Sequence, residues 1–197
     1  NFQTGNVTAM YHMFYGCTSL EELDVSRWDT GKVTSFRSMF SSNGQNTGDM
    51  KFKDLDVENW DVSSATDMSY MFYGCGELTE LDLSKWDVSN VTTMYHMFTD
   101  CIKMERYNFS GWDTSKVTVV NGIFNSNRAL KTIDLSDFDT QNIQDFSQLF
   151  DGASALETVI GMDKWDTSSG LYYVELFTGT KVKEVDLSSF DMTTALR

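Results

Sequence analysis

Leu78-Thr-Glu-Leu-Asp-Leu-Ser-Lys-Trp-Asp87 and Val91-Thr-Thr-Met-Tyr-His-Met-Phe98 are neighbouring segments with two different apolar periods. In the first segment, Leu81 and Leu83 alternate with polar residues, which is the period of a β-strand with one buried face. In the second, apolar residues stand at positions i, i+3, i+6 and i+7, which predicts one apolar stripe on a short helix. Together the two segments predict a strand followed by a short helix.

This pair of segments recurs along the chain. Its clearest marker is an aromatic residue followed by Asp, and successive markers are 32, 26, 26, 26, 27 and 25 residues apart. The markers are Trp28-Asp29, Trp60-Asp61, Trp86-Asp87, Trp112-Asp113, Phe138-Asp139, Trp165-Asp166 and Phe190-Asp191. A four-residue strand and a two-turn helix cannot bury their apolar faces alone, so we expect the copies to stack on one another.

The repeat predicts an α/β fold. We expect a right-handed, leucine-rich-repeat-like solenoid of about seven 26-residue turns, with a parallel β-sheet on one face and short helices on the other. Residues 1–197 are expected to form a single repeat domain, cut from a longer array. The chain contains no Pro, as expected if backbone N–H groups are paired turn after turn.

Three places depart from the repeat, and one of them is the degenerate last copy at residues 170–180. The second copy is longer, and its extra residues fall in a Gly-, Asn- and Ser-rich insertion at 41–48, which predicts a loop that bulges from the solenoid. In the sixth copy, Ile160-Gly161 adds one residue to the strand segment and predicts a bulge or kink there.

Composition excludes several classes of partner. The 197 residues include 15 Lys and Arg but 29 Asp and Glu, which gives a formal net charge of −14. Nucleic-acid affinity depends on basic side chains that neutralise phosphate, so this charge argues against nucleic acid. It argues equally against docking on anionic lipid. No apolar run approaches the roughly 18 residues of a membrane-spanning helix.

The combined motif resembles a known family. The segments Leu78–Asp87 and Val91–Phe98 are similar to the 26-residue bacterial surface-protein repeat called domain of unknown function 285, a branch of the BspA-like leucine-rich repeats. The resemblance covers essentially the whole chain. It implies an exported, cell-surface protein with a proposed role in adhesion, and it supplies no catalytic residues.

The outward positions of the predicted strands form a mostly acidic face. In leucine-rich repeats this open strand face is the usual surface for a partner. The candidate residues are Glu22, Asp24, Asp54, Asp56, Glu80, Asp82, Arg106, Asn108, Asp134, Glu184 and Asp186. A second candidate is the loop residues Ser42, Asn43, Gly44, Gln45 and Asn46. The face could attract a basic protein or host-surface ligand, hold Ca²⁺ between turns, or serve only as a solvated surface. Calcium is not favoured, because a flat row of carboxylates supplies few well-placed oxygens.

The seven Asp residues of the aromatic-Asp markers form a second column. We expect each to accept backbone N–H bonds, as the cap of the helix that follows, in an Asx-type turn. The alternative is a stripe that binds cations.

Cysteine and histidine give little sign of chemistry. Cys17, Cys75 and Cys101 share one position in the repeat, and we expect buried free thiols there, although a bridge between Cys75 and Cys101 stays open. His12 and His96 also share a position, three turns apart, on the order of 15 Å at the spacing of a sheet, which is too far to share a metal.

These patterns favour a non-enzymatic protein-binding or adhesion module that presents the strand face and the 41–48 loop to its ligand and needs no cofactor. The alternatives are a structural spacer with no ligand of its own and a cation-binding acidic solenoid. A hydrolase with paired carboxylates is disfavoured, because such enzymes place two acids in different environments, whereas a uniform repeat gives them the same one.

Overall fold

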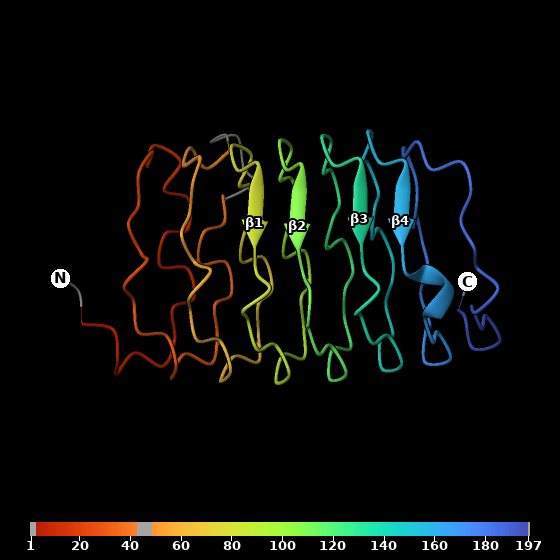
Figure 1. Cartoon of the computed structure of the whole chain (residues 1–197), viewed down its shortest axis with the longest axis horizontal. Helices are drawn as coiled ribbons and strands as arrows, with labels where there is room; N and C mark the ends of the chain where they lie inside the picture. The colour runs from red at the N-terminus through yellow and green to blue at the C-terminus, as the bar shows by residue number, and fades with distance from the viewer. Residues whose placement is uncertain (1–2, 43–48, 197) are drawn as a thin grey trace.

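The chain winds into a repeat solenoid. The computed structural model describes residues 3–42 and 49–196. Successive copies of the repeat lie side by side, and the chain advances steadily along the long axis of the molecule (Figure 1). Neighbouring coils are joined by backbone hydrogen bonds on two sides, with the apolar side chains between them.

Short parallel strands form one side of the coil. They are β1 (Glu80–Asp82), β2 (Arg106–Asn108), β3 (Thr132–Asp134) and β4 (Thr158–Ile160). β1 pairs in parallel with β2, with Leu81 opposite Tyr107, and β3 pairs in parallel with β4. Leu81 is buried while Glu80 and Asp82 are exposed, so the alternation read from the sequence sets the two faces of the strand. The predicted parallel sheet is present as these two pairs of strands.

The opposite side consists of tandem turns, and the prediction of short helices is wrong. Residues 3–42 and 49–196 contain no α-helix, and their only helical element is the 3₁₀ segment η1 (Met162–Lys164). Where a helix was expected, the Met97 N–H donates to the Met94 carbonyl at 3.0 Å, closing a turn. The N–H of the preceding residue, His96, instead donates to the Asn121 carbonyl of the neighbouring coil at 2.9 Å.

This alternation of hydrogen bonds explains why a helix does not form. A helix would use its N–H groups internally and leave none for the neighbouring coil, whereas here they alternate between closing a turn and joining two coils. Each first turn has a positive φ at its third residue, as a type II turn requires; His96 has a φ of 51°. The equivalent residues in the other copies are His12, Ser38, Tyr70, Gly122, Gln148 and Glu175, which we call the left-handed column.

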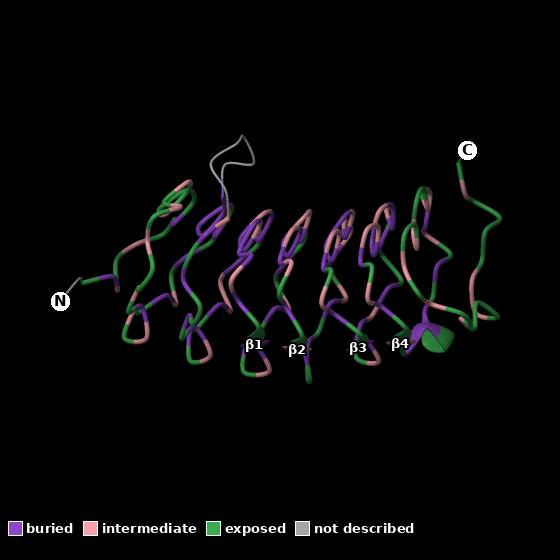
Figure 2. Ribbon diagram, turned by 90° about the horizontal axis from the view of Figure 1, so that it is seen from above, coloured by how far each residue is buried: buried purple, intermediate pink, exposed green. Residues whose placement is uncertain are grey.

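The two hydrogen-bonded sides lie on opposite faces of the coil, with buried segments between them (Figure 2). On the turn side, isolated parallel bridges continue from copy to copy, from Ala9 with Ser35 to Asp145 with Tyr172. N–H groups are thus used between neighbouring coils on both sides, and this pairing accounts for the absence of Pro, which has no N–H to donate.

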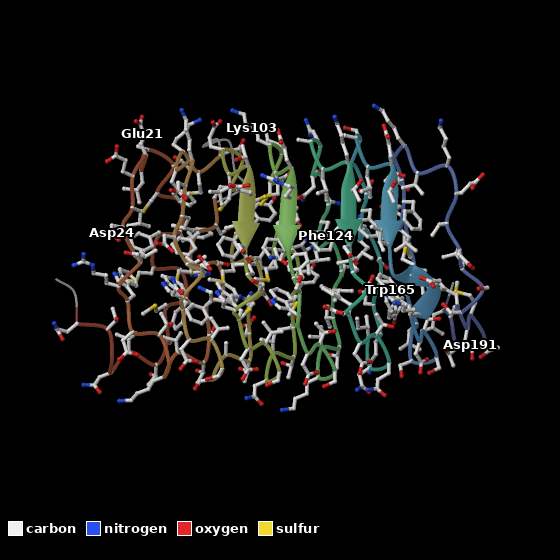
Figure 3. All side chains as sticks on the ribbon, in the orientation of Figure 1. Glu21, Asp24, Lys103, Phe124, Trp165 and Asp191 are labelled. Atoms are coloured by element: carbon white, nitrogen blue, oxygen red, sulfur yellow. The ribbon has the colours of Figure 1, made fainter. Side chains whose placement is uncertain are left out.

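Aromatic side chains fill the space between the two sides. One phenylalanine from each copy stacks on the next, with ring centroids 5.5 to 5.9 Å apart, in a series that we call the phenylalanine stack. Its members are Phe14, Phe40, Phe72, Phe98, Phe124, Phe150 and Phe177. Figure 3 shows Phe124 and Trp165 among the side chains that fill the coil, while Glu21 and Lys103 project from its edge.

The extra residue of the sixth copy is accommodated beside η1. Gly161 precedes this 3₁₀ segment with a φ of 96°, a conformation that favours glycine. A Cβ atom at Gly161 would lie 2.5 Å from the Cα atom of Ser136, so the backbones of the two copies approach closely there. β4 itself pairs with β3 over its full length, and the departure predicted at Ile160-Gly161 takes the form of η1 directly after the strand.

Candidate functional site

Two adjoining grooves lie along the strand side of the early coils. The first has a volume of about 750 Å³ and the second about 580 Å³, and they share Asp54 and Asp56. We call them the strand-side grooves. Of the predicted face residues, Glu22 and Asp24 line the first, Asp54 and Asp56 line both, and Glu80, Asp82, Arg106 and Asn108 line the second.

The remaining predicted face residues lie elsewhere. Asp134 ends β3, and Asp186 lies in the last copy; neither lines either groove. Glu184 lines a separate hollow beside β4, together with Lys181 and Lys183. The structure therefore brings together the face residues from the first four copies and separates them from those of the later ones.

Most of the outward aspartates help to build the backbone turn that follows them. The Asp82 carboxylate accepts hydrogen bonds from the Ser84 hydroxyl at 2.7 Å and from the Ser84 N–H at 3.1 Å. These bonds hold the pKa of Asp82 below its usual value. The Ser N–H two residues on makes the same bond to Asp24, Asn108, Asp134 and Asp186. These side chains are already engaged within their own repeat.

Asp56 is the exception in this series. Its repeat has Glu58 at the position where the others have Ser, so Asp56 lacks the hydroxyl donor. Within residues 3–42 and 49–196, neither Asp54 nor Asp56 takes part in a hydrogen bond or ion pair, and both side chains are exposed. The two uncommitted carboxylates stand where the two grooves meet.

Two ion pairs lie in or beside the second groove. Arg106 contacts Glu80 across the β1–β2 register at 2.6 Å, and Lys85 contacts Glu58 at 2.7 Å. Both pairs are largely exposed, so each contributes little to stability. Lys85 is also attracted to Asp56: the bond to Glu58 raises the pKa of Lys85 most, and the charge of Asp56 is a further cause that raises it.

The aromatic-Asp column also builds turns. All seven carboxylates accept a backbone N–H from the residue two positions on, at 2.9 to 3.4 Å, which confirms the Asx-type turn. The expected helix caps are wrong, because no helix follows. Among residues 3–42 and 49–196, no group of three or more His, Cys, Asp and Glu side chains is placed to hold a metal ion.

The predicted loop is only partly visible. Ser42 is buried and lines a groove on the turn side, separate from the grooves that contain Arg106 and Asn108. Asn43, Gly44, Gln45 and Asn46 lie outside the described residues.

In several copies the residue at the cysteine position donates a hydrogen bond to the neighbouring coil. All three cysteines are unbridged; Cys75 and Cys101 are buried, whereas Cys17 is exposed, contrary to expectation. The Cys101 thiol donates to the Phe72 carbonyl at 3.3 Å. Asn127, at the same position one copy later, donates its amide to Phe98 at 2.8 Å. Burial raises the pKa of Cys101 to about 12, so this thiol is not a nucleophile at neutral pH.

A groove also lies on the turn side, and it was not predicted from the sequence. It has a volume of about 590 Å³ and is lined by His12, Tyr70 and His96 of the left-handed column, with polar residues beside them. The available sequence signal was the occurrence of Tyr and His between the apolar positions of three early copies, at Tyr11-His12, Tyr70 and Tyr95-His96.

Stacked coils with short parallel strands are typical of a solenoid of the leucine-rich-repeat class. A leucine-rich repeat protein from Bacteroides ovatus has a similar structure, with a TM-score of 0.54 and 18% identity over 89% of this chain and 39% of that one. A leucine-rich repeat protein from Eubacterium ventriosum gives a TM-score of 0.43 and 15% identity, covering 79% of this chain and 46% of that one. The chain thus spans less than half the length of either protein.

The sequence also matches a family over almost its full length. The family is described as "Mycoplasma protein of unknown function, DUF285", and the matches cover residues 1–53, 43–133 and 120–196. The chain belongs to this family, as the repeat motif predicted. No curated protein matches the chain. In the part of the chain that the structure describes, no helix is long and apolar enough to cross a membrane.

Proposed function

We propose that this chain is a non-enzymatic protein-binding module of a bacterial surface protein, and that its strand-side grooves hold a basic segment of the partner, with the 41–48 loop as a second contact. The observation that carries the proposal is the pair of uncommitted carboxylates, Asp54 and Asp56, where the two grooves meet. The surface location rests on the family and on the resemblance of its repeat to bacterial surface proteins.

Charge favours a basic partner. The first groove is lined by six carboxylates and by only two cations, Lys51 and Lys53. The chain as a whole carries a net charge of −14, so the surrounding field adds to the local attraction. Complementary charge of this kind speeds the encounter and selects the partner more than it increases affinity.

The state of the ionisable groups supports a non-enzymatic role. Catalytic acids and bases have pKa values shifted by burial or by a charged partner inside a cleft. Here the lowered pKa values of Asp82, Asp134 and Asp186 follow from Ser hydrogen bonds at exposed positions. The same turn chemistry repeats from copy to copy, so these outward aspartates share one environment and form no inequivalent pair among themselves.

The alternative is a structural spacer. It is favoured by the same Asx turns, because they show that most outward carboxylates serve the fold. The two functions differ at Asp54 and Asp56, which a spacer would not need. A cation-binding solenoid is the third possibility, and it would place Ca²⁺ between carboxylates of neighbouring coils.

Binding of an oligolysine peptide distinguishes these functions. The double variant Asp54→Asn with Asp56→Asn should bind about tenfold more weakly, or ~1.4 kcal/mol for two exposed charges. The matched control, Glu157→Gln with Asp163→Asn, removes the same charge from the sixth copy and should bind like the wild type. Equal weakening in both variants would point to diffuse attraction and favour the spacer. A melting temperature that rises in Ca²⁺ relative to EDTA would favour the cation-binding solenoid.

A further inference from the structure

The turn side of the solenoid carries a groove whose chemistry differs from that of the strand side. It has a volume of about 590 Å³, within the usual range of ligand sites, and its lining comes from five successive copies. At about 4.8 Å per copy, those five copies extend over roughly 20 Å. The groove is therefore long enough for an extended ligand that lies across several coils.

Aromatic rings form part of its lining. Tyr70 and His96, from neighbouring copies, stack with centroids 5.4 Å apart and an interplanar angle of 16°. The stack is seated by Gly122, because a Cβ atom there would collide with the His96 ring. Tyr15 and Tyr73 add further half-exposed rings to the lining.

Tyr70 and His96 have strained backbone conformations. Tyr70 has a φ of 59° and His96 a φ of 51°, in the left-handed region where glycine is favoured and bulky residues are strained. Gly122 holds the same position one copy later, so the fold accepts glycine there. The backbone does not require Tyr70 and His96, and their side chains meet in the groove.

The polar groups of the groove are suited to an uncharged ligand. Arg37 and Asp100 both line it and balance one another, in contrast to the strongly acidic strand side. Thr99 donates its hydroxyl to the Gly122 carbonyl at 2.6 Å, so Nδ1 of His96 must donate to Thr99, which lies 2.8 Å away. Nε2 of His96 is then left as an acceptor. Burial lowers the pKa of His96 and keeps the ring neutral.

We propose that this turn-side groove binds a neutral oligosaccharide. A pyranose ring has a face of C–H groups, which packs on aromatic rings, and an edge of hydroxyl groups, which both donate and accept hydrogen bonds. The groove supplies both kinds of contact: the partly exposed rings of Tyr15 and Tyr73, beside the Tyr70–His96 stack, for the C–H face, and Asp100, Arg37 and Asn125 for the hydroxyls. This site is independent of the acidic grooves on the strand side.

Calorimetric titration with neutral tetrasaccharides of glucose, galactose, mannose and N-acetylglucosamine tests the proposal. At least one should bind the wild-type chain with micromolar to millimolar affinity. Tyr70→Gly and His96→Gly should each weaken it at least about tenfold. Both variants should fold, because glycine relieves the strain of a positive φ. Gln148→Gly, in the left-handed column but outside the groove, is the matched control and should bind like the wild type.

Failure of all four sugars to bind would overturn the proposal, and so would unchanged affinity in both groove variants. Binding of an uncharged, tyrosine-rich peptide without binding of any sugar would also overturn it and assign the groove to a polypeptide. The variant with Asp54→Asn and Asp56→Asn should keep its affinity for the sugar, so that the two proposals fail or succeed separately.

Discussion

Phe98 and Phe124 are 26 residues apart in the chain, yet their rings stack with centroids 5.9 Å apart and an interplanar angle of 1°. Each ring belongs to the phenylalanine stack, and each also packs against Tyr107. The contact shows how this fold is stabilised. A residue is buried chiefly by the equivalent residue of the neighbouring copy, so stability depends on contacts between neighbours along the coil.

Replacing Phe98 by Ala should remove about 3 to 5 kcal/mol of unfolding free energy, because it leaves a cavity between Phe72 and Phe124. Urea denaturation measures this loss. The exposed Tyr11→Ala is the control and should change stability by less than about 0.5 kcal/mol. A small loss for Phe98→Ala would mean that the stack does not carry the stability of the coil.

The tryptophan column provides a second comparison. The indole N–H of Trp112 donates to the Leu83 carbonyl at 2.8 Å, whereas that of Trp165 is buried without a partner among the described residues. Phenylalanine already occupies the equivalent position at Phe138. Trp112→Phe should therefore be more destabilising than Trp165→Phe by about 1 kcal/mol, since only the first loses a hydrogen bond, while the second removes a buried N–H that has no partner among the described residues. Equal losses in thermal melts would contradict this difference.

The thiols should differ in reactivity. Cys17 is exposed, while Cys75 and Cys101 are buried and burial raises the pKa of both. A thiol reagent should therefore modify one cysteine in the folded chain at neutral pH and all three after denaturation. Cys17→Ser should abolish the fast reaction. Rapid modification of Cys101 in the native chain would show that the coil opens locally.

The Asx turns should make the stability of the fold depend on pH in the acidic range. The pKa of Asp82, Asp134 and Asp186 is lowered in the folded state, so their contribution is present above the ordinary value of 3.8 and is lost as the pH falls through the lowered values. Replacing all three by Asn should make the melting temperature less sensitive to pH below about 4. Asn108 already forms the same turn, so the variant should keep its structure at pH 7. Asp163→Asn is the control, and an unchanged acid response in the triple variant would contradict the account.

Much of the fold could be predicted from the sequence because the repeat fixes which side chains are buried. Val91, Met94, Met97 and Phe98 are all buried, as their spacing predicted. The same spacing led to the wrong prediction of short helices, because tandem turns that repeat every three residues place side chains on one face as a short helix does. Glycine would have marked the positive φ angles, but most copies have Ser, Tyr, His, Gln or Glu there.

From the sequence, the candidate site could be predicted only as one face of the solenoid, without the individual residues that are free to bind. The period-two alternation identified the outward residues, but it could not distinguish Asp82, which is bonded to Ser84, from the uncommitted Asp56. That distinction depends on one residue, Glu58, at a position that Ser occupies in the copies of Asp24, Asp82, Asn108, Asp134 and Asp186. The turn-side groove was missed because its rings point outward from a segment that was taken to be an amphipathic helix.

The most direct test of the proposed function is a nuclear magnetic resonance titration of the isotopically labelled chain with an oligolysine peptide. The account predicts that amide shifts concentrate at residues 54–58 and in β1 and β2, where the strand-side grooves meet. The amides of the left-handed column should stay unchanged. Shifts of equal size at the aspartates of every copy, from Asp29 to Asp191, would contradict a defined site and leave only a uniformly charged spacer.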